Sequence, residues 1–541
     1  MKGIMQSWPL TVNKLIEHAN HVNPTREIVT RRVEGHIERT TYRDIYIMAK
    51  QVSNALIDDG IGLGDRIATL AWNSERHMAT WYGAMGIGAI LHTVNPRLHP
   101  DHIAWIVNHA EDKVLILDKT FLPIIESIRE KLTSVKRFVI YADDDTMPDN
   151  TLGAVAFDTW VRARPAEARW GDFPEDTACG LCYTSGTTGN PKGVVYSHRS
   201  NLLHTFIALN KDALGIGTQD SVMPVVPMFH ANAWGLAFAC PAVGSKIVMP
   251  GAQMDGASIY ELLTVEKVSF TAAVPTVWLM LMTHLQENDL KLPHLNKVVI
   301  GGSALPERIL RAFEEDYDVE VIHAWGMTET SPLGTLGTLP ADLAEADLDQ
   351  RIQHKLKQGR PPFGVELRIA DDEGQTLQHD GKVSGRLLVR GAAIAAGYFR
   401  GDGGDVLDGR GFFDTGDVAT LDEQCTMQIT DRAKDVIKSG GEWISSIEIE
   451  NIAVGHPKVA NAAAIGVYHP KWDERPLLII EPVKDEPPTR EDVLAELEGK
   501  IAKWWTPDDV VFVDAIPLGA TGKINKLALR EQFKDYKLST A

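Results

Sequence analysis

Eleven consecutive residues, 183–193, combine four Ser or Thr side chains, three glycines and Lys192. Glycines let several backbone N–H groups point at one anion, while hydroxyls and an ammonium add donors and positive charge. The chemistry that such a loop supports is polyphosphate binding. A Walker A loop would need a second glycine at position 191, where the sequence has Pro191. A Ser/Thr/Gly-rich surface turn is the plainer alternative.

Two other segments with small or polar residues follow predicted strands, at 301–304 and 325–329. Because ligands bind at the carboxyl ends of strands in open α/β sheets, all three segments could serve one nucleotide. Trp325 could stack on a purine, a contact worth ~1–3 kcal/mol. The alternatives are that Trp325 belongs to the core and that Glu329 is a carboxylate at a helix start.

Further along the chain, Asp417 could accept two hydrogen bonds on its two oxygens, and Arg432 follows about a strand pair later. Two adjacent glycines at 440–441 would let a ligand approach the backbone closely, although a plain glycine turn explains them equally well. His230 lies among apolar residues, where a histidine is more often a satisfied core group.

Four motifs together resemble the acyl-adenylate-forming enzymes, which include acyl-CoA synthetases, firefly luciferases and carrier-loading adenylation domains. They are Y-T-S-G-T-T-G-x-P-K-G at 183–193, W-G-M-T-E at 325–329, T-G-D at 415–417 and P-x-x-x-x-G-K at 517–523. The resemblance extends over about residues 10–533. G-E-W-I-S at 441–445 and P-M-F-H-x-N-A-W at 227–234 resemble the fatty-acyl branch, including 3-(methylthio)propionate–CoA ligases.

The resemblance implies roles for particular residues. The ATP/AMP site would comprise Thr184, Ser185, Gly186, Thr187, Thr188, Gly189, Lys192, Gly302, Ser303, Ala304, Trp325, Gly326, Met327, Thr328, Asp417 and Arg432. Lys523, Glu329 and His230 would be catalytic, and Glu329 with Thr184 would hold Mg²⁺. The coenzyme A channel would comprise Lys438, Gly440, Gly441, Glu442 and Trp443, the acyl pocket or gate Trp234, Gly235 and Val274, and the hinge Lys434. The family usually has Tyr at the position of Trp325, and many members have Asp at that of Lys434; Lys526 receives no role.

The activity implied is that of an AMP-forming acyl-CoA synthetase using ATP, Mg²⁺ and coenzyme A on a short- to medium-chain carboxylic acid, with 3-(methylthio)propionate as one candidate. A medium- or long-chain fatty-acid ligase and an enzyme that loads a carrier protein are alternatives. A nucleotide-sensing or acyl-binding protein without turnover is a third. Relatives are often homodimers.

Composition is consistent with this interpretation. At 541 residues the chain should form two or more domains, and its net charge of −19 argues against nucleic-acid or anionic-membrane partners. Cys179 and Cys182 form a C-x-x-C pair, but a buried strand is favoured over a redox or zinc site because no second pair exists. Few cysteines and no signal peptide indicate the cytoplasm. The charge-free stretch 221–245 contains prolines that argue against a membrane span.

Alternating strand and helix patterns through residue 358 predict an α/β fold with parallel-rich sheets flanked by helices. Helices are expected at 10–22, 45–56, 77–85, 201–209 and 275–285, with the first turn of 201–209 facing the phosphate loop. Short alternating strands from Gly359 predict a small antiparallel β unit. A mobile α+β domain follows, with strand 462–467 and helix 490–504. The predicted domains are 1–433 and 434–541.

Overall fold

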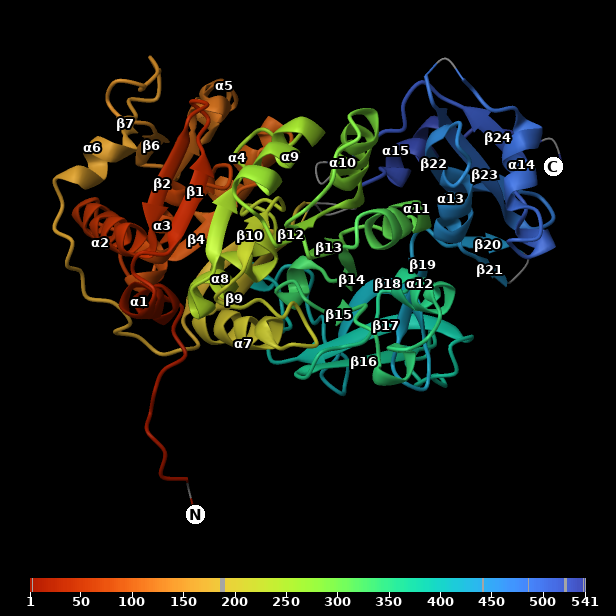
Figure 1. Ribbon diagram of the computed structural model, residues 1–541, viewed down its shortest axis with the longest axis horizontal. Helices are drawn as coiled ribbons and strands as arrows, with labels where there is room; N and C mark the ends of the chain where they lie inside the picture. The colour runs from red at the N-terminus through yellow and green to blue at the C-terminus, as the bar shows by residue number, and fades with distance from the viewer. Residues whose placement is uncertain are drawn as a thin grey trace.

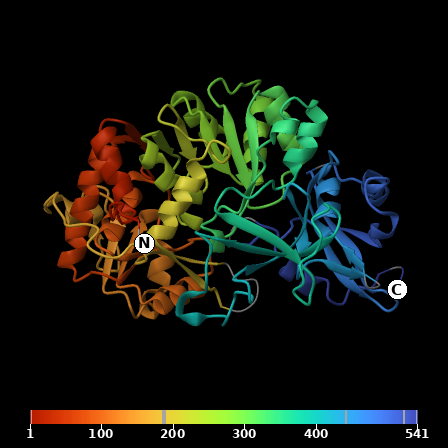
Figure 2. The same ribbon diagram turned by 90° about the horizontal axis from the view of Figure 1, so that it is seen from below.

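The computed structural model describes residues 1, 3–184, 190–439, 442–484, 486–519, 523–538 and 540. Two parallel-rich sheets with their helices form the large part of the molecule, a small β unit lies beside them, and the C-terminal domain stands at one end (Figure 1). Seen from below, the three parts surround a common centre (Figure 2). The predicted fold class is confirmed.

The first sheet has the strand order β7-β6-β5-β3-β4-β8-β9 and is parallel except for β9. Its strands are β3 (Arg66–Leu70), β4 (Ile90–Thr93), β5 (Val114–Asp118), β6 (Arg137–Tyr141), β7 (Val155–Ala156), β8 (Ala178–Tyr183) and β9 (Gly193–Ser197). The helices of this part are α1 (Asn13–Val22), α2 (Tyr42–Asp58), α3 (Glu75–Gly86), α4 (Pro100–Ala110), α5 (Leu122–Ser127), α6 (Phe157–Arg162) and α7 (His198–Leu209). The sheet brings the predicted phosphate loop to one edge, between β8 and β9.

The second sheet has the order β15-β14-β13-β12-β10-β11-β1-β2, with β2 and β15 antiparallel at its edges. Its strands are β1 (Glu27–Arg31), β2 (Ile37–Thr41), β10 (Ser221–Pro224), β11 (Lys246–Met249), β12 (Phe270–Ala273), β13 (Lys297–Gly301), β14 (Glu320–Trp325) and β15 (Thr335–Leu336). Its helices are α8 (Leu236–Val243), α9 (Gly256–Val265), α10 (Pro275–Glu287), α11 (Glu307–Arg311) and α12 (Leu348–Leu356). Parallel β13 and β14 end together, so the two other predicted ligand segments start at the same edge.

Two smaller sheets complete the chain. An antiparallel sheet contains β16 (Val365–Ala370), β17 (Ser384–Gly391), β18 (Phe413–Leu421) and β19 (Met427–Arg432), which confirms the predicted β unit. The C-terminal domain contains β20 (Ile437–Ser439), β21 (Glu442–Ile444), β22 (Val459–His469), β23 (Asp473–Pro482) and β24 (Asp509–Phe512), with α13 (Ser446–Val454), α14 (Arg490–Leu497) and α15 (Lys526–Gln532). The connection between them is the turn at 433–436.

Two local predictions are wrong. Helix α7 does not face the phosphate loop: antiparallel β9 carries the chain back along β8, and the amide of His198 donates to Thr177 at the opposite end of that strand. Helix α14 ends at Leu497 rather than at 504, because the chain turns through Gly499 with a left-handed φ of 74°.

The apolar stretch at 221–245 folds as β10, a short turn and α8, as its prolines predicted. Among the residues that the structure describes, no helix could cross a membrane. Cys179 and Cys182 are free, buried thiols that enter different apolar clusters on the two faces of the sheet, as expected of residues three apart on a strand.

Candidate active site

One cavity of about 990 Å³ opens where the two large sheets, the β unit and the C-terminal domain meet. The predicted residues that line it are Thr184, His230, Trp234, Gly302, Ser303, Ala304, Trp325, Gly326, Met327, Thr328, Glu329, Asp417, Arg432, Lys434 and Lys523. They come from segments separated by up to 339 positions, since the chain runs from Thr184 to Lys523. The three strand-end segments therefore do share one cleft.

The phosphate segment is a β-hairpin connection. Tyr183 pairs with Gly193, and the amide of Thr184 donates to the carbonyl of Lys192 at 2.9 Å. The residues between, Ser185–Gly189, lie outside those described. Lys192 does not line the cavity, but its ammonium stands 5.0 Å from the ring centre of Tyr398, which does.

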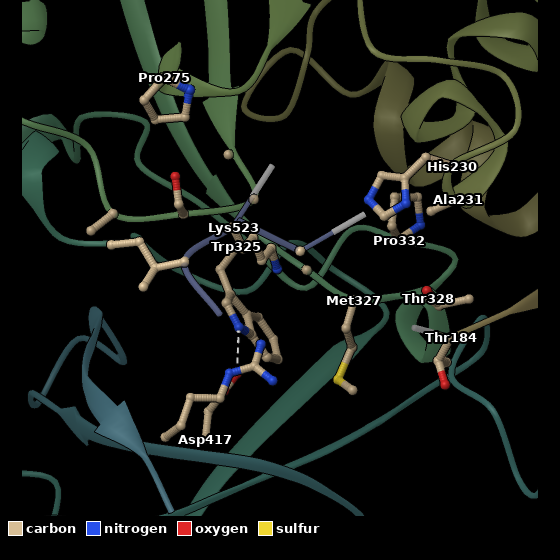
Figure 3. A pocket seen from close by; sticks show the side chains of 18 of the residues that line it. Thr184, His230, Ala231, Pro275, Trp325, Met327, Thr328, Pro332, Asp417 and Lys523 are labelled. Carbon is tan, nitrogen blue, oxygen red and sulfur yellow. Dashed lines mark hydrogen bonds and ion pairs between the residues drawn. The ribbon is translucent and has the colours of Figure 1, made fainter. Parts of the chain in front are cut away.

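Trp325 and Asp417 lie side by side in one wall of the cleft (Figure 3), and Arg432 completes a bonded group with them. The indole Nε1 of Trp325 donates to Asp417 Oδ2 at 2.9 Å, and Arg432 Nε lies 2.9 Å from Asp417 Oδ1. Trp325 packs in the apolar cluster beneath the β unit and is only 7% exposed. The ring therefore belongs to the core, as one interpretation expected, and it also lines the cavity; stacking on a purine stays a prediction.

The segment after Trp325 turns tightly over the cleft. A Cβ at Gly326 would lie 1.5 Å from the carbonyl oxygen of Pro332, so only glycine fits there. The carbonyl of Thr328 accepts a 2.8 Å hydrogen bond from the hydroxyl of Tyr196. Glu329 is 5% exposed, and its Oε1 accepts a 2.6 Å hydrogen bond from the hydroxyl of Tyr398.

Burial raises the pKa of Glu329, and the bond from Tyr398 opposes this rise. No cluster of three metal-ligating side chains occurs among the described residues, so no protein cage for a metal is present there. A single anionic side chain beside the predicted phosphate site nevertheless suits Mg²⁺, which usually binds one or two carboxylates together with substrate phosphates. Glu329 therefore fits the predicted metal role. When bound, Mg²⁺ would neutralise part of the negative charge on the phosphates of ATP.

Lys523 enters the cleft from the C-terminal domain, between His230 and Trp325 (Figure 3). It sits near the end of a hairpin closed by a bond from the amide of Gly519 to its carbonyl. Desolvation in the cleft and the positive charge of Arg432 together lower the pKa of Lys523 to about 8, although the negative charges of Asp417 and Glu329 oppose this shift. Since the side chain remains exposed to water in the cavity, solvent moderates this shift.

His230 stands opposite, and burial lowers its pKa to about 4, helped by the positive charges of Lys523 and Arg97. The imidazole is therefore neutral near pH 7 and can orient an acid without adding a charge. A left-handed turn follows, with φ of 57° at Asn232, 50° at Ala233 and 53° at Trp234. Such conformations cost non-glycine residues roughly 1–2 kcal/mol each.

This turn sets the position of the predicted acyl gate. A Cβ on Gly302 would be 3.1 Å from Val274 Cγ1 and 3.9 Å from the Trp234 ring, so these side chains adjoin the floor of the cleft. Gly235 faces away from the cavity, where an added Cβ would meet His204 at 2.7 Å. The absence of a side chain at Gly235 therefore makes room for His204 rather than for a ligand.

Only one predicted side chain of the coenzyme A segment, that of Lys438, can be placed relative to this cleft. Lys438 is exposed and does not line the cavity. Gly440 and Gly441, with the side chains of Glu442 and Trp443, lie outside what the structure describes. The β20–β21 hairpin and α15, which follows Lys523, stand at different ends of the small domain (Figure 1).

Sequence reasoning missed Tyr398, which connects Glu329 to Lys192, and Tyr196, which fixes Thr328. Both are single tyrosines outside the recognised motifs. The alternation of residues along β9 could have indicated that Tyr196 is buried, but no local signal marks Tyr398.

Comparison with known proteins identifies this arrangement. A model described as AMP-binding enzyme matches residues 16–399, and one described as AMP-binding enzyme C-terminal domain matches 448–523. The chain belongs to the AMP-binding enzyme family. It is 47% identical over 99% of both chains to a 3-methylmercaptopropionyl-CoA ligase of Ruegeria lacuscaerulensis. It is 44% identical to a medium-chain-fatty-acid–CoA ligase of Ectopseudomonas oleovorans, covering 100% of this chain and 99% of the relative.

The crystal structure of anthranilate CoA ligase AuaEII in complex with anthranoyl-AMP superposes with a TM-score of 0.86 and 25% identity, covering 99% of each chain. The protein is thus an AMP-forming acyl-CoA synthetase that uses ATP, Mg²⁺ and coenzyme A to convert an acid to its thioester through acyl-AMP. The predicted family, activity class and cofactors are confirmed.

Proposed function

We propose that this AMP-binding enzyme activates a short- to medium-chain carboxylic acid, with 3-(methylthio)propionate as the first candidate. Two relatives named 3-methylmercaptopropionyl-CoA ligase, at 47% and 48% identity over 99% of the chain, support this choice. The alternatives remain a medium- or long-chain fatty acid and transfer of the acyl group to a carrier protein. A long-chain-fatty-acid–CoA ligase of Thermus thermophilus is 44% identical.

An apolar wall of the cavity carries the proposal. It includes Phe270 and Ala272 of β12, Val299 and Gly301 of β13, and Ala324 of β14. In the registers Ala272 pairs with Val299, and Gly301 pairs with Ala324, so these side chains share one face of the sheet.

Phe270 is the member of this wall farthest from the carboxyl ends of the strands. Measured along the strands, Phe270 lies four residues before the level of Gly301, which corresponds to about 13 Å at the usual rise per residue. A wall of this depth suits a short or medium acyl chain better than an extended long one. Phe270 lines the cavity at this level and is 2% exposed, so we propose that it closes the acyl site there.

For the first half-reaction, we propose that residues 184–189 hold the phosphates, Thr328 meets the α-phosphate, and Asp417 with Arg432 meets the ribose. His230 would orient the acid, whose carboxylate oxygen attacks the α-phosphorus as pyrophosphate leaves. Lys523 would offset the repulsion between the two anions, and Glu329 and Thr184 would hold the metal. The observation that favours this assignment is the position of Lys523 in the same cleft as Thr328, Glu329 and Asp417.

For the second half-reaction, we propose that residues 434–541 turn about Lys434 as one domain, separately from 1–433. This motion would withdraw Lys523 and bring Lys438 and residues 440–443 to the cleft, where the thiolate of coenzyme A attacks the acyl carbon and AMP leaves. Lys438 does not line the cavity, and such a turn would change this.

The test is a panel of carboxylic acids from short to long, with thioether members, scored for AMP release with coenzyme A and with a carrier protein. The highest kcat/KM is expected for 3-(methylthio)propionate or an unbranched acid of similar length with coenzyme A. A best substrate among long-chain acids would overturn the substrate proposal, and turnover with carrier protein alone would overturn the choice of acceptor.

We further propose a cytoplasmic homodimer. Buried free thiols suit a reducing compartment. The segment before α1 extends away from the body with Ile4, Met5 and Trp8 exposed, which offers apolar side chains for a second copy to cover (Figure 1). Sedimentation of the full chain and of a chain lacking residues 1–9 tests the dimer, and cell fractionation tests the compartment.

A further inference from the structure

A buried polar cluster of Asp431, Ser446, Glu450 and Lys526 joins the end of β19 to the C-terminal domain. Asp431 is fully buried, and its Oδ2 accepts bonds from the amide of Ser446 at 2.6 Å and from the hydroxyl at 2.7 Å. Lys526 Nζ donates to the Ser446 hydroxyl at 2.5 Å and lies 2.7 Å from Glu450 Oε1. We call these four residues the interdomain clamp.

Charge balance within the interdomain clamp depends on Lys526. Burial raises the pKa of both Asp431 and Glu450. Burial lowers the pKa of Lys526, but the attraction of Glu450 and Asp431 outweighs it and leaves the pKa above its ordinary value. Removing the ammonium would leave two buried carboxylates without their cation, which is among the more damaging changes that a buried ion network can suffer.

The position of the clamp connects it to both moving parts of the proposed cycle. Asp431 lies three residues before Lys434, and Ser446 is the first residue of α13 beyond it. Lys526 lies three residues after Lys523 and begins α15, at the base of the hairpin that carries Lys523. The bonds between Asp431 and Ser446 therefore cross the proposed hinge, and Lys526 supports them from the segment that delivers Lys523.

We propose that Lys526 is a positioning residue, which holds the C-terminal domain in the orientation that places Lys523 in the cleft for acyl-AMP formation. This inference rests on the proposed role of Lys523. Because Asp431 and Ser446 lie on opposite sides of the hinge, their bonds break when the domain turns. The clamp thus stabilises the domain orientation used in the first half-reaction and contributes nothing to the orientation used in the second.

The experiment uses the full chain with Lys526→Met, Lys526→Arg and Lys523→Ala, the Lys523→Ala/Lys526→Met double variant and, as a matched control, Lys534→Met. Lys534 is an exposed lysine two residues beyond α15 that pairs with Glu531. Acid-dependent ATP–pyrophosphate exchange measures the first half-reaction, and coenzyme A-dependent consumption of supplied acyl-AMP measures the second. Hydrogen–deuterium exchange of the peptide that contains Ser446 reads the clamp directly.

Lys526→Met is expected to lower pyrophosphate exchange about 100-fold and leave the second half-reaction within about twofold, while Lys526→Arg retains most exchange and Lys534→Met all of it. If Lys526 acts through Lys523, the double variant is no slower than Lys523→Ala. Protection of the Ser446 amide should fall in Lys526→Met.

Equal loss in both half-reactions, additive loss in the double variant, or unchanged protection at Ser446 would overturn the clamp. Full pyrophosphate exchange in Lys523→Ala would instead overturn the proposed role of Lys523. In that event the change in protection of the Ser446 amide still decides whether the clamp exists.

Discussion

The pH dependence of acyl-AMP formation tests the role of Lys523 most sharply. Its pKa is lowered, to about 8, by crowding in the cleft and by Arg432. Neighbouring groups titrate elsewhere, since the pKa of His230 is about 4 and that of the Tyr398 hydroxyl is raised above its ordinary value. If the protonated ammonium is needed, activity is full below pH 8 and is lost as pH rises through this value.

The magnitude follows from the fraction protonated. With a pKa of about 8, roughly a tenth of the lysine is charged at pH 9 and roughly a hundredth at pH 10, so the rate should fall about tenfold per pH unit. Water in the cavity would move the midpoint of this pH profile upward, towards the ordinary pKa of a lysine. Bound ATP adds negative charge and should shift the midpoint for kcat above that for kcat/KM.

The assay is ATP–pyrophosphate exchange without coenzyme A, because the thiol of coenzyme A ionises in the same range. Mg²⁺ and the acid are kept saturating between pH 6.5 and 10, values chosen to bracket a pKa of about 8. Lys523→Arg is the matched variant, since a guanidinium stays charged throughout. It should be slower at neutral pH yet lose the alkaline fall. A fall that persists in Lys523→Arg would refute the reasoning.

Three further outcomes are expected. Trp325→Phe keeps a ring but loses the bond to Asp417, so the KM for ATP should rise about tenfold, whereas an unchanged KM would show that the bond is dispensable. Phe270→Ala should extend the preferred acyl chain, measured as a shift in kcat/KM across a series of acids, and an unchanged preference would place the end of the acyl site elsewhere. Tyr398→Phe removes the hydrogen bond that opposes the raised pKa of Glu329, so this pKa should rise further. As the pH is lowered, the variant should lose activity at a higher pH than the unchanged enzyme does, and it should need more Mg²⁺. Identical activity profiles at acid pH would contradict a role for this contact.

Much of the fold was readable locally. Strand and helix periods identified the parallel sheets, because buried strands such as β5 and amphipathic helices such as α2 bury the faces that their sequences imply. Helix α7 and the end of α14 were misjudged because a local pattern does not show which way the preceding strand runs or where a single glycine turns the chain.

Sequence by itself determined the chemistry of each motif, since the donors of residues 184–192 and the charge of Lys523 are properties of residue types in order. Only the tertiary structure decided which groups face one another. Asp417 is bonded to Trp325, Tyr398 to Glu329 and Lys526 to Glu450 across many intervening residues, and such pairs follow from packing rather than spacing. Lys526 shows the physical reason: it received no role from the sequence, and it is a buried ion because the fold brings Ser446 and Glu450 beside it.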